Sequence, residues 1–354
     1  MNERLLEYIE TSFLKELLNN KDITDISFNG EDIYYKDNSI GRVKSNITLS
    51  PKEPYDFIRQ IANLSDSQFS LTNPILDVSV DRYRISATHL SMTRKNREPV
   101  VNFSIRIGYN ELRIKDDESF IHPFVMKLLI LAIENKMSIA ISGKTGTGKT
   151  EFQKYLISKM EDNTRLIIID NINELETDYF TKNLDSQTWL LLNNNVSKLT
   201  FDDLIKSALR SNPDWIIVGE SRGKEMLSIL NSAMSGHPTI TTLHAKDAPS
   251  TYHRMARMCM ISNESLSFED TLIDIYDHFK FIVHIKAYFD VNKKHIVRYV
   301  ESLGTNVDNS YYEIYHYPDV FNKIPIFLKS DFNLSTKDWK DLINQIPKKE
   351  VKNG

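Results

Sequence analysis

The stretch from Gly143 to Thr150 has the residue types and spacing of a phosphate-binding loop. It reads G-x-x-x-x-G-K-[ST], follows a short apolar run at 138–142 and precedes a helix expected over about 151–160. The three glycines of the motif would let the backbone turn tightly, so that successive N–H groups point at phosphate oxygens. The N-terminus of the following helix would add about half a positive charge. The sequence therefore predicts a nucleotide-binding site.

Roles within this loop follow from side-chain chemistry. Lys149 would reach the terminal phosphates of ATP, and the hydroxyl of Thr150 would hold Mg²⁺. The alternative, a glycine-rich turn beside a lysine, is disfavoured because only 11 of the 354 residues are glycine. The predicted nucleotide-binding residues here are Gly143, Lys144, Thr145, Gly146, Thr147, Gly148, Lys149, Thr150 and Glu151.

Two acidic residues and a histidine follow further apolar runs. Glu174 and Glu220 come after the apolar runs at 166–169 and 215–218, and His244 follows the Thr-rich strand predicted at 239–243. Because the carboxyl ends of parallel strands share one crevice, we expect these side chains opposite the loop. The predicted catalytic residues are Lys149, Glu174, Glu220 and His244, with Thr150 and Glu220 as metal ligands. Structural alternatives are a polar loop at Glu174, an acid that starts a helix at Glu220, and a packed or surface histidine at 244.

The elements that would position these residues alternate between strands and helices. Apolar runs and amphipathic segments alternate over 121–285, which predicts an α/β fold: a RecA-like core with a mostly parallel sheet. Glu220 is expected just beyond the end of its strand, after Gly219. Residues 286–354 predict a strand-rich extension with a disordered tail over 348–354.

A second, smaller domain is expected before this core. Residues 1–108 predict an α+β (PAS-like) domain, with a helix over 3–19 and a hairpin that turns at Asn29 and Gly30. Residues 109–120 are polar and without apolar pattern, as in an interdomain linker.

Composition excludes several classes of protein. A net charge of −4 argues against a chain whose main task is to hold nucleic acid. No apolar run approaches the 18 residues or so that a membrane-spanning helix needs, and the N-terminus does not resemble a signal peptide. The single cysteine, Cys259, excludes an intrachain disulfide and a multi-cysteine zinc site. The sequence therefore predicts a cytoplasmic protein that meets membranes only through partners.

Taken together, these residues resemble the type II/IV secretion ATPase superfamily. Four motifs stand in that family's order: a Walker A loop at 143–150, an aspartate box at 169–175, an atypical Walker B segment over 204–223 and a histidine box at 235–245. The resemblance covers about residues 15–285. The box that usually begins Glu-Asp reads Asp170-Asn171 here, so Glu174 carries its acid. The missing four-cysteine zinc module points to the conjugation or tad-pilus branch, although pilus retraction motors lack this module too.

The resemblance implies a homo-oligomer, a hexamer, in which ATP is clamped between the core and the N-terminal domain. Mg²⁺-dependent hydrolysis would swing that domain to drive pilus assembly or transport. The expected partners are inner-membrane platform or coupling proteins at the cytoplasmic face of the membrane. The arginines expected to meet the phosphates are Arg84 and Arg106, with Arg94 and Arg97 as further candidates and Arg210 and Arg222 acting across a subunit boundary. A surface arginine on a strand edge is the alternative for each.

Two other functions remain open at this point. A RecA-like nucleic-acid motor would use the same loop but needs a basic channel, and 93–97 is the only compact basic cluster near the first domain. We therefore expect no stable nucleic-acid binding. A weakly hydrolysing, ATP-binding ring subunit is the second alternative, which the departure at Asp170-Asn171 leaves open.

Overall fold

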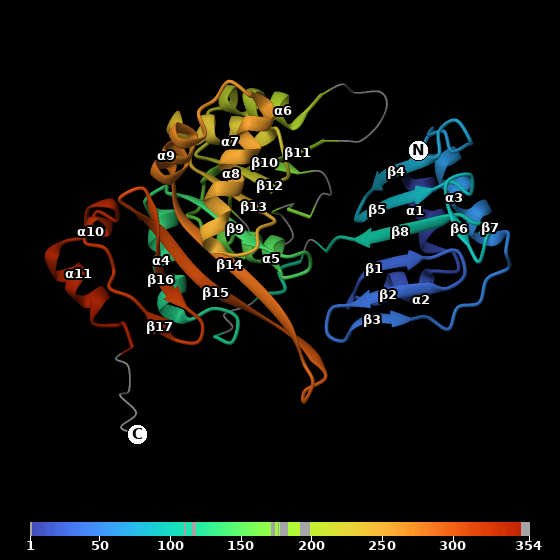
Figure 1. Cartoon of the computed structure of the whole chain (residues 1–354), viewed down its shortest axis with the longest axis horizontal. Coiled ribbons are helices and arrows are strands. Elements are labelled where there is room, and N and C mark those ends of the chain that lie inside the picture. Colours follow the sequence, from blue (N-terminus) through green and yellow to red (C-terminus); the bar gives the residue numbers. More distant parts are fainter. Residues whose placement is uncertain are drawn as a thin grey trace.

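The computed structural model has two main sheets, one in each half of the chain (Figure 1). It describes residues 2–109, 111–114, 118–170, 174–175, 177, 183–191 and 199–347. The tail predicted to be disordered, 348–354, lies outside the described residues, as do 171–173 of the aspartate box.

The first sheet is antiparallel, with strand order β3-β2-β1-β8-β5-β4. The helices of this half are α1 (Asn2–Glu10), α2 (Lys15–Asn19) and α3 (Glu53–Leu64), and the strands are β1 (Ile23–Phe28), β2 (Ile33–Asp37), β3 (Gly41–Lys44), β4 (Ile75–Val80), β5 (Tyr83–Thr88), β6 (Arg94–Lys95), β7 (Glu98–Pro99) and β8 (Asn102–Ile107). Exposed and buried residues alternate along β4, so one face of the sheet packs on the helices.

The helix expected over 3–19 is divided in two. The hydroxyls of Thr11 and Ser12 donate to the carbonyls of Glu7 (2.7 Å) and Ile9 (2.6 Å). Ser12 Oγ also accepts from the N–H of Leu14 (3.3 Å), which replaces a helical bond. The expected hairpin is present, but Phe28 pairs with Ile33, so four residues connect its strands.

The second sheet has nine strands in the order β11-β10-β12-β13-β9-β14-β15-β16-β17. Its first part contains α4 (Pro123–Glu134), β9 (Ser138–Gly143), α5 (Lys149–Ile157), β10 (Arg165–Asp170), β11 (Asp185–Leu190), α6 (Phe201–Ala208), η2 (Leu209–Ser211), β12 (Trp215–Ser221), α7 (Glu225–Met234), β13 (Thr239–Leu243), α8 (Ala248–Ser262) and α9 (Phe268–His278). All neighbouring strands in the part of the sheet that runs β11-β10-β12-β13-β9-β14 pair in parallel. The predicted α/β fold is confirmed.

Helices cover both faces of this parallel sheet. Along β10, Leu166 and Ile168 pack in one core cluster with α4 and α5, whereas Ile167 and Ile169 pack in the other with α6 to α9. Burial on both faces explains the continuous apolar run of this strand. The edge strand β11 has no such run, because its residues are only partly buried, and sequence reasoning did not predict it. No helix in the described ranges is long and apolar enough to cross a membrane.

The C-terminal part continues the same sheet. It contains β14 (Phe279–Asp290), β15 (His295–Val307), β16 (Ser310–His316), β17 (Val320–Phe321), α10 (Phe327–Asp331) and α11 (Thr336–Ile343). Strand β14 pairs in parallel with β9, and β15 to β17 add antiparallel strands. The domain boundary expected at residue 285 falls inside β14. Figure 1 shows the β14–β15 hairpin extending from the core toward the edge of the first sheet where β3 lies.

Candidate active site

The phosphate-binding loop joins the end of β9 to the start of α5, as the motif predicts. Gly146 (φ 78°) and Gly148 (φ 98°) lie in the left-handed region, which residues with a Cβ rarely adopt. A Cβ added to Gly143 would lie 2.8 Å from Thr147 Oγ1 and would also collide with the carbonyl of Ile285. Each glycine of the motif is therefore required by the local backbone.

Lys149 lies buried at the centre of this loop. Its Nζ donates to the carbonyls of Gly143 and Lys144, both at 3.1 Å, and lies 3.4 Å from His244 Nδ1. The pKa of Lys149 is lowered to about 8, chiefly by burial and also by the nearby charges of Arg106 and Arg222, against the opposing effect of Glu220. The ammonium group is therefore present at pH 7 but is easily discharged above pH 8.

We expect the affinity for ATP to fall as the pH rises above 8, by up to about tenfold per pH unit, because binding must return one proton to Lys149. Calorimetry in two buffers of different ionisation enthalpy should detect proton uptake at pH 9 and little at pH 7. Lys149→Met should abolish this uptake. An affinity that stays constant from pH 7 to 9.5 would contradict the assignment.

Through Lys149, the free energy of unfolding should change with pH in the opposite direction to the affinity for ATP. The unfolded chain holds the proton up to a pKa of about 10.5, whereas the folded chain releases it near 8. Between these values the unfolded state binds more protons, so the contribution of Lys149 to stability rises with pH.

Glu220 lies within β12, not beyond its end as expected. The pairing of β12 with β13 shifts register between Val218 and Ser221, and the Thr242 hydroxyl donates to the Gly219 carbonyl (2.8 Å) in this bulge. The bulge turns Glu220 toward the loop. A Cβ on Gly219 would lie 2.7 Å from Asp170 Oδ1, so the glycine allows the two strand ends to approach.

Two basic side chains hold the Glu220 carboxylate. Its Oε2 accepts from Arg222 (2.6 Å), and its Oε1 lies 2.9 Å from His244 Nε2. Burial raises the pKa of Glu220, but the Arg222 hydrogen bond and the charges of Arg222 and Lys149 outweigh it, so the net pKa is below the usual value. Burial and the Lys149 charge lower the pKa of His244. At neutral pH the carboxylate is ionised and the imidazole is neutral.

Glu174 joins the core to the first sheet. Its backbone N–H donates to Asp170 Oδ2 (2.9 Å), and its Oε1 lies 3.4 Å from Nε of Arg106 on β8. A Cβ on Gly108 would lie 2.9 Å from Glu174 Cγ, which shows how closely the two parts meet. Burial raises the pKa of Glu174 against the lowering effect of Arg106. The site thus contains two carboxyl groups with opposite pKa shifts.

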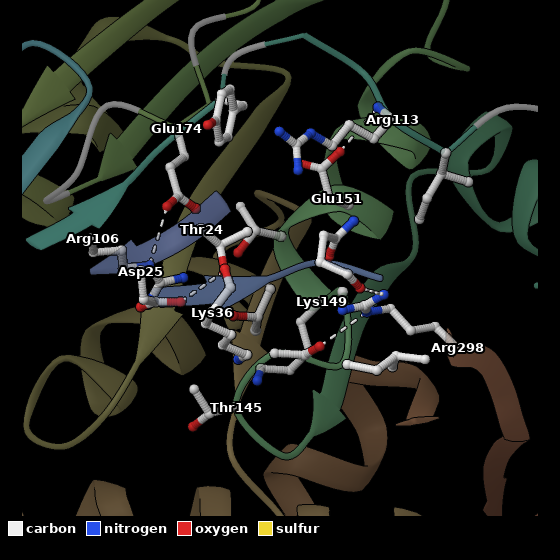
Figure 2. A pocket seen from close by; sticks show the side chains of 18 of the residues that line it. Thr24, Asp25, Lys36, Arg106, Arg113, Thr145, Lys149, Glu151, Glu174 and Arg298 are labelled. Atoms are coloured by element: carbon white, nitrogen blue, oxygen red, sulfur yellow. Dashed lines mark hydrogen bonds and ion pairs between the residues drawn. The ribbon is translucent and has the colours of Figure 1, made fainter. Parts of the chain in front are cut away.

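A cavity of about 620 Å³ lies between the two sheets at this point (Figure 2). The first half of the chain contributes Thr24, Asp25, Lys36, Asn38, Arg106 and Ile107, and the C-terminal hairpin contributes His295, Ile296, Val297 and Arg298. The volume is in the range of small-molecule sites in proteins. Its walls come from both sheets and from the segment that joins them.

Most of the predicted residues line this cavity. Those that do are Arg106, Thr145, Gly146, Gly148, Lys149, Thr150, Glu151, Glu174, Glu220 and His244. Gly143, Lys144, Thr147 and Arg84 are not among the lining residues. Lys144 lies in a shallower hollow with His244 and Arg254, and Thr147 donates to the Lys144 carbonyl (2.9 Å). Arg84 lies directly opposite Arg106 in the first sheet.

The other candidate arginines lie elsewhere. Arg94 donates to the carbonyl of Leu90 (2.8 Å) on the surface of the first half, and Arg97 is exposed. Arg210 lies in the short helix η2, whereas Arg222 reaches the site through Glu220.

The described part of the linker expected over 109–120 packs against α5. The Arg113 N–H donates to Glu151 Oε2 (3.0 Å), and the buried Lys154 pairs with Glu151 (2.8 Å) and bonds the Tyr109 carbonyl. The Arg113 guanidinium stacks 3.9 Å from the Tyr109 ring centre. Glu151, predicted to bind nucleotide, is thus also an anchor for this segment.

Sequence reasoning missed several basic residues of the cavity. Lys36, Arg113 and Arg298 line it but belong to no motif, and each stands among residues without a distinctive pattern. Lys36 approaches Gly146 closely enough to block a Cβ there. Only the three-dimensional fold brings these three cations to one cavity.

The residues present fit a site for Mg²⁺ bound mainly by water and phosphate. Thr150 and Glu220 line the cavity, and the buried Glu220 Oε1 makes no hydrogen bond of regular geometry with the described residues besides its 2.9 Å ion-pair contact with His244 Nε2. Such an oxygen suits a metal-bound water as partner. In the same part of the chain, no cluster of three His, Cys, Asp or Glu forms a metal cage. Mg²⁺ sites that use one or two protein ligands and substrate phosphates have this character.

The fold and the site define a P-loop nucleotide-binding protein whose cavity is completed by a second domain. The family model described as "Type II/IV secretion system protein" matches residues 111–280. An uncharacterised protein of Bacillus anthracis is 31% identical over 315 residues, which cover 86% of this chain and 69% of the relative. The chain belongs to the type II/IV secretion ATPase superfamily, as its motifs predicted.

Two further comparisons give one relative by sequence and one solved structure of the same fold. Protein VirB11 of Rhizobium radiobacter is 29% identical over 216 residues, which cover 59% of this chain and 58% of VirB11. The ATPase DotB of Legionella pneumophila has the same fold, with a TM-score of 0.61 at 22% identity over 97% of this chain and 87% of DotB.

Proposed function

We propose that this protein is a Mg²⁺-dependent, hexameric ATPase that powers a type IV secretion, conjugation or type IV-like pilus machine at the cytoplasmic face of the membrane. The observation that carries the proposal is the convergence of Lys149, Glu220 and Glu174 on one cavity that Arg106 of the first domain helps to close. Membership of the secretion ATPase superfamily supports the cellular role.

The two carboxyl groups suit different tasks. Glu220 is ionised, and its buried Oε1 makes no regular hydrogen bond besides the 2.9 Å contact with His244 Nε2, so it would accept from metal-bound water and hold Mg²⁺ together with Thr150. Glu174 has a raised pKa, which brings its proton affinity nearer to neutral pH, and it would take a proton from the attacking water. Mg²⁺, when bound, neutralises charge on the phosphates.

The basic residues would stabilise the phosphates. Lys149 would bind the terminal phosphates, and Arg106 would place a second positive charge on the transferring group. His244 would respond to the terminal phosphate, since it lies between Glu220 and Lys149. Because Arg106 belongs to the first domain, hydrolysis would change the contact that holds this domain to the core.

We also propose residue 108 as the end of that domain.

Phosphate release by the purified wild type, with mass measured in the same buffers, tests the proposal. We expect steady release with Mg-ATP, its loss on addition of EDTA, and a species near six subunits. Tight ATP binding to a monomer without turnover would instead indicate a weakly hydrolysing ring subunit. A salt-sensitive stimulation by single-stranded DNA would favour a nucleic-acid motor.

A further inference from the structure

The C-terminal hairpin connects the phosphate-binding loop to the first domain. Arg298, on β15, donates from Nε to the carbonyl of Gly146 and from Nη1 to the carbonyl of Asn38, both at 3.0 Å. Two residues away, the Ile296 N–H donates to the carbonyl of Ser39 (2.6 Å). Figure 2 shows Arg298 reaching from its strand toward the loop beside Lys149. One guanidinium group therefore bridges two parts of the chain that belong to different sheets.

The bond to Gly146 fixes the orientation of a peptide inside the phosphate-binding loop. In a planar trans peptide the C=O and the following N–H point in opposite directions. Holding the Gly146 carbonyl on the Arg298 side therefore directs the Thr147 N–H the other way, toward the Lys144 carbonyl at 3.4 Å inside the loop. Gly146 has the backbone freedom to turn this peptide, so an outside bond is needed to hold it.

The two hydrogen bonds of Arg298 depend on the position of the first domain. Both hydrogen bonds that the Arg298 side chain donates go to backbone carbonyls, and no carboxylate of the described residues forms an ion pair with it. A guanidinium presents several donors in one rigid plane, so it serves two carbonyls at once only while both keep their positions. Any displacement of the first domain that moves Asn38 away from β15 breaks one of the two bonds.

We propose that Arg298 is a positioning residue that ties Gly146 to the first domain, so that the affinity of the loop for ATP depends on where this domain lies. The inference rests on the proposed function and adds a residue outside every motif of the family. Because coupling between two equilibria is reciprocal, ATP binding must favour the docked position of the domain by the same factor. The C-terminal hairpin thus acts as the connection between nucleotide and domain motion.

Equilibrium binding of Mg-ATP to the full chain tests the first half of this inference. Arg298→Gln removes both the positive charge and the planar guanidinium group that serves two carbonyls. Arg298→Lys keeps the charge but not the guanidinium group. We expect both variants to bind about tenfold more weakly than the wild type, within the usual range of such couplings. Lys293→Gln, which removes a positive charge from the turn of the same hairpin, is the control and should bind normally. Equal melting temperatures would show that the variants fold.

Spin-label distances test the second half, because a residue that merely supports the fold would leave them unchanged. Leu71 and Ile261 are 73% and 55% exposed, on the first domain and on the core, and Leu71→Cys and Ile261→Cys provide the labelling sites. The native Cys259 is fully buried and should not react. In the wild type, ATP should narrow the distance distribution. In both Arg298 variants it should stay broad with and without ATP.

The outcomes separate this inference from the proposed function. Arg298→Lys binding like the wild type would reduce the role of Arg298 to its charge and overturn the inference. If ATP narrows the distance distribution in Arg298→Gln as it does in the wild type, the inference is overturned as well. That result would not bear on the proposed ATP turnover. A wild type that binds no Mg-ATP would overturn the proposed function, and the inference with it.

Discussion

Lys149→Ala should lower ATP turnover on the order of 10²–10³-fold and weaken Mg-ATP binding. The ammonium group is the buried cation at the centre of the loop, with its donors aimed at the carbonyls of Gly143 and Lys144. A phosphate group would meet this charge in a site where burial strengthens electrostatic interactions. Phosphate release and equilibrium binding, measured on the same preparations, separate the two losses.

The control for this variant is another lysine of the core. Lys206 is exposed on α6, pairs with Asp202 one turn away and does not line the cavity, so Lys206→Ala removes an equal charge outside the site. Exposed pairs of this kind contribute little to stability. Turnover should be unchanged in Lys206→Ala. Wild-type turnover in Lys149→Ala would show that the loop does not bind the reacting phosphates.

Glu220→Gln should abolish most turnover, again by about 10²–10³-fold, while ATP binding is retained. The amide has the shape of the carboxylate but lacks the charge that holds His244 and Arg222 in place and that would order the Mg²⁺-bound water. A loss confined to kcat is expected for an interaction made mainly in the transition state. Single-turnover assays and nucleotide binding distinguish it from a loss of affinity.

Glu225 is the matched control for Glu220. Its carboxylate accepts from the N–H groups of Arg222 and Gly223 (2.9 Å for Gly223) at the start of α7, so Glu225 performs the helix-start role that was the alternative for Glu220. Glu225→Gln should lower stability slightly and leave kcat near the wild-type value. If Glu220→Gln retains full turnover while Lys149→Ala has none, the Walker B assignment is wrong.

Motifs made the centre of the site predictable from the sequence. The loop at 143–150 is a local pattern, and the parallel sheet brings the ends of β9, β10, β12 and β13 together, so Glu174, Glu220 and His244 could be placed in one crevice. The strand bulge at Gly219 could not be foreseen, because it depends on pairing with β13. Thus the residue was predicted, but its position within the strand was not.

The outer parts of the site depended on tertiary contacts that leave no pattern in the chain. Arg298 lies more than a hundred residues from the loop that it contacts, in a hairpin whose sequence matches no motif. The segment containing Arg113 reads as a polar linker, because its polar contacts with distant residues, such as those of Arg113 with Glu151, Lys21 and the Tyr109 ring, leave no periodic pattern. Arg84 and Arg106 were equivalent by sequence, and only the placement of β8 beside Glu174 distinguishes them.

The two ends of the nine-stranded sheet bear on how subunits could associate. In the described part of the chain the sheet ends at β17, which is two residues long, and at β11, whose residues are mostly polar. Short or polar edge strands are poor templates for pairing with another chain. Copies of this protein are therefore expected to assemble through side-chain surfaces, and the sheet should not propagate from one subunit into the next.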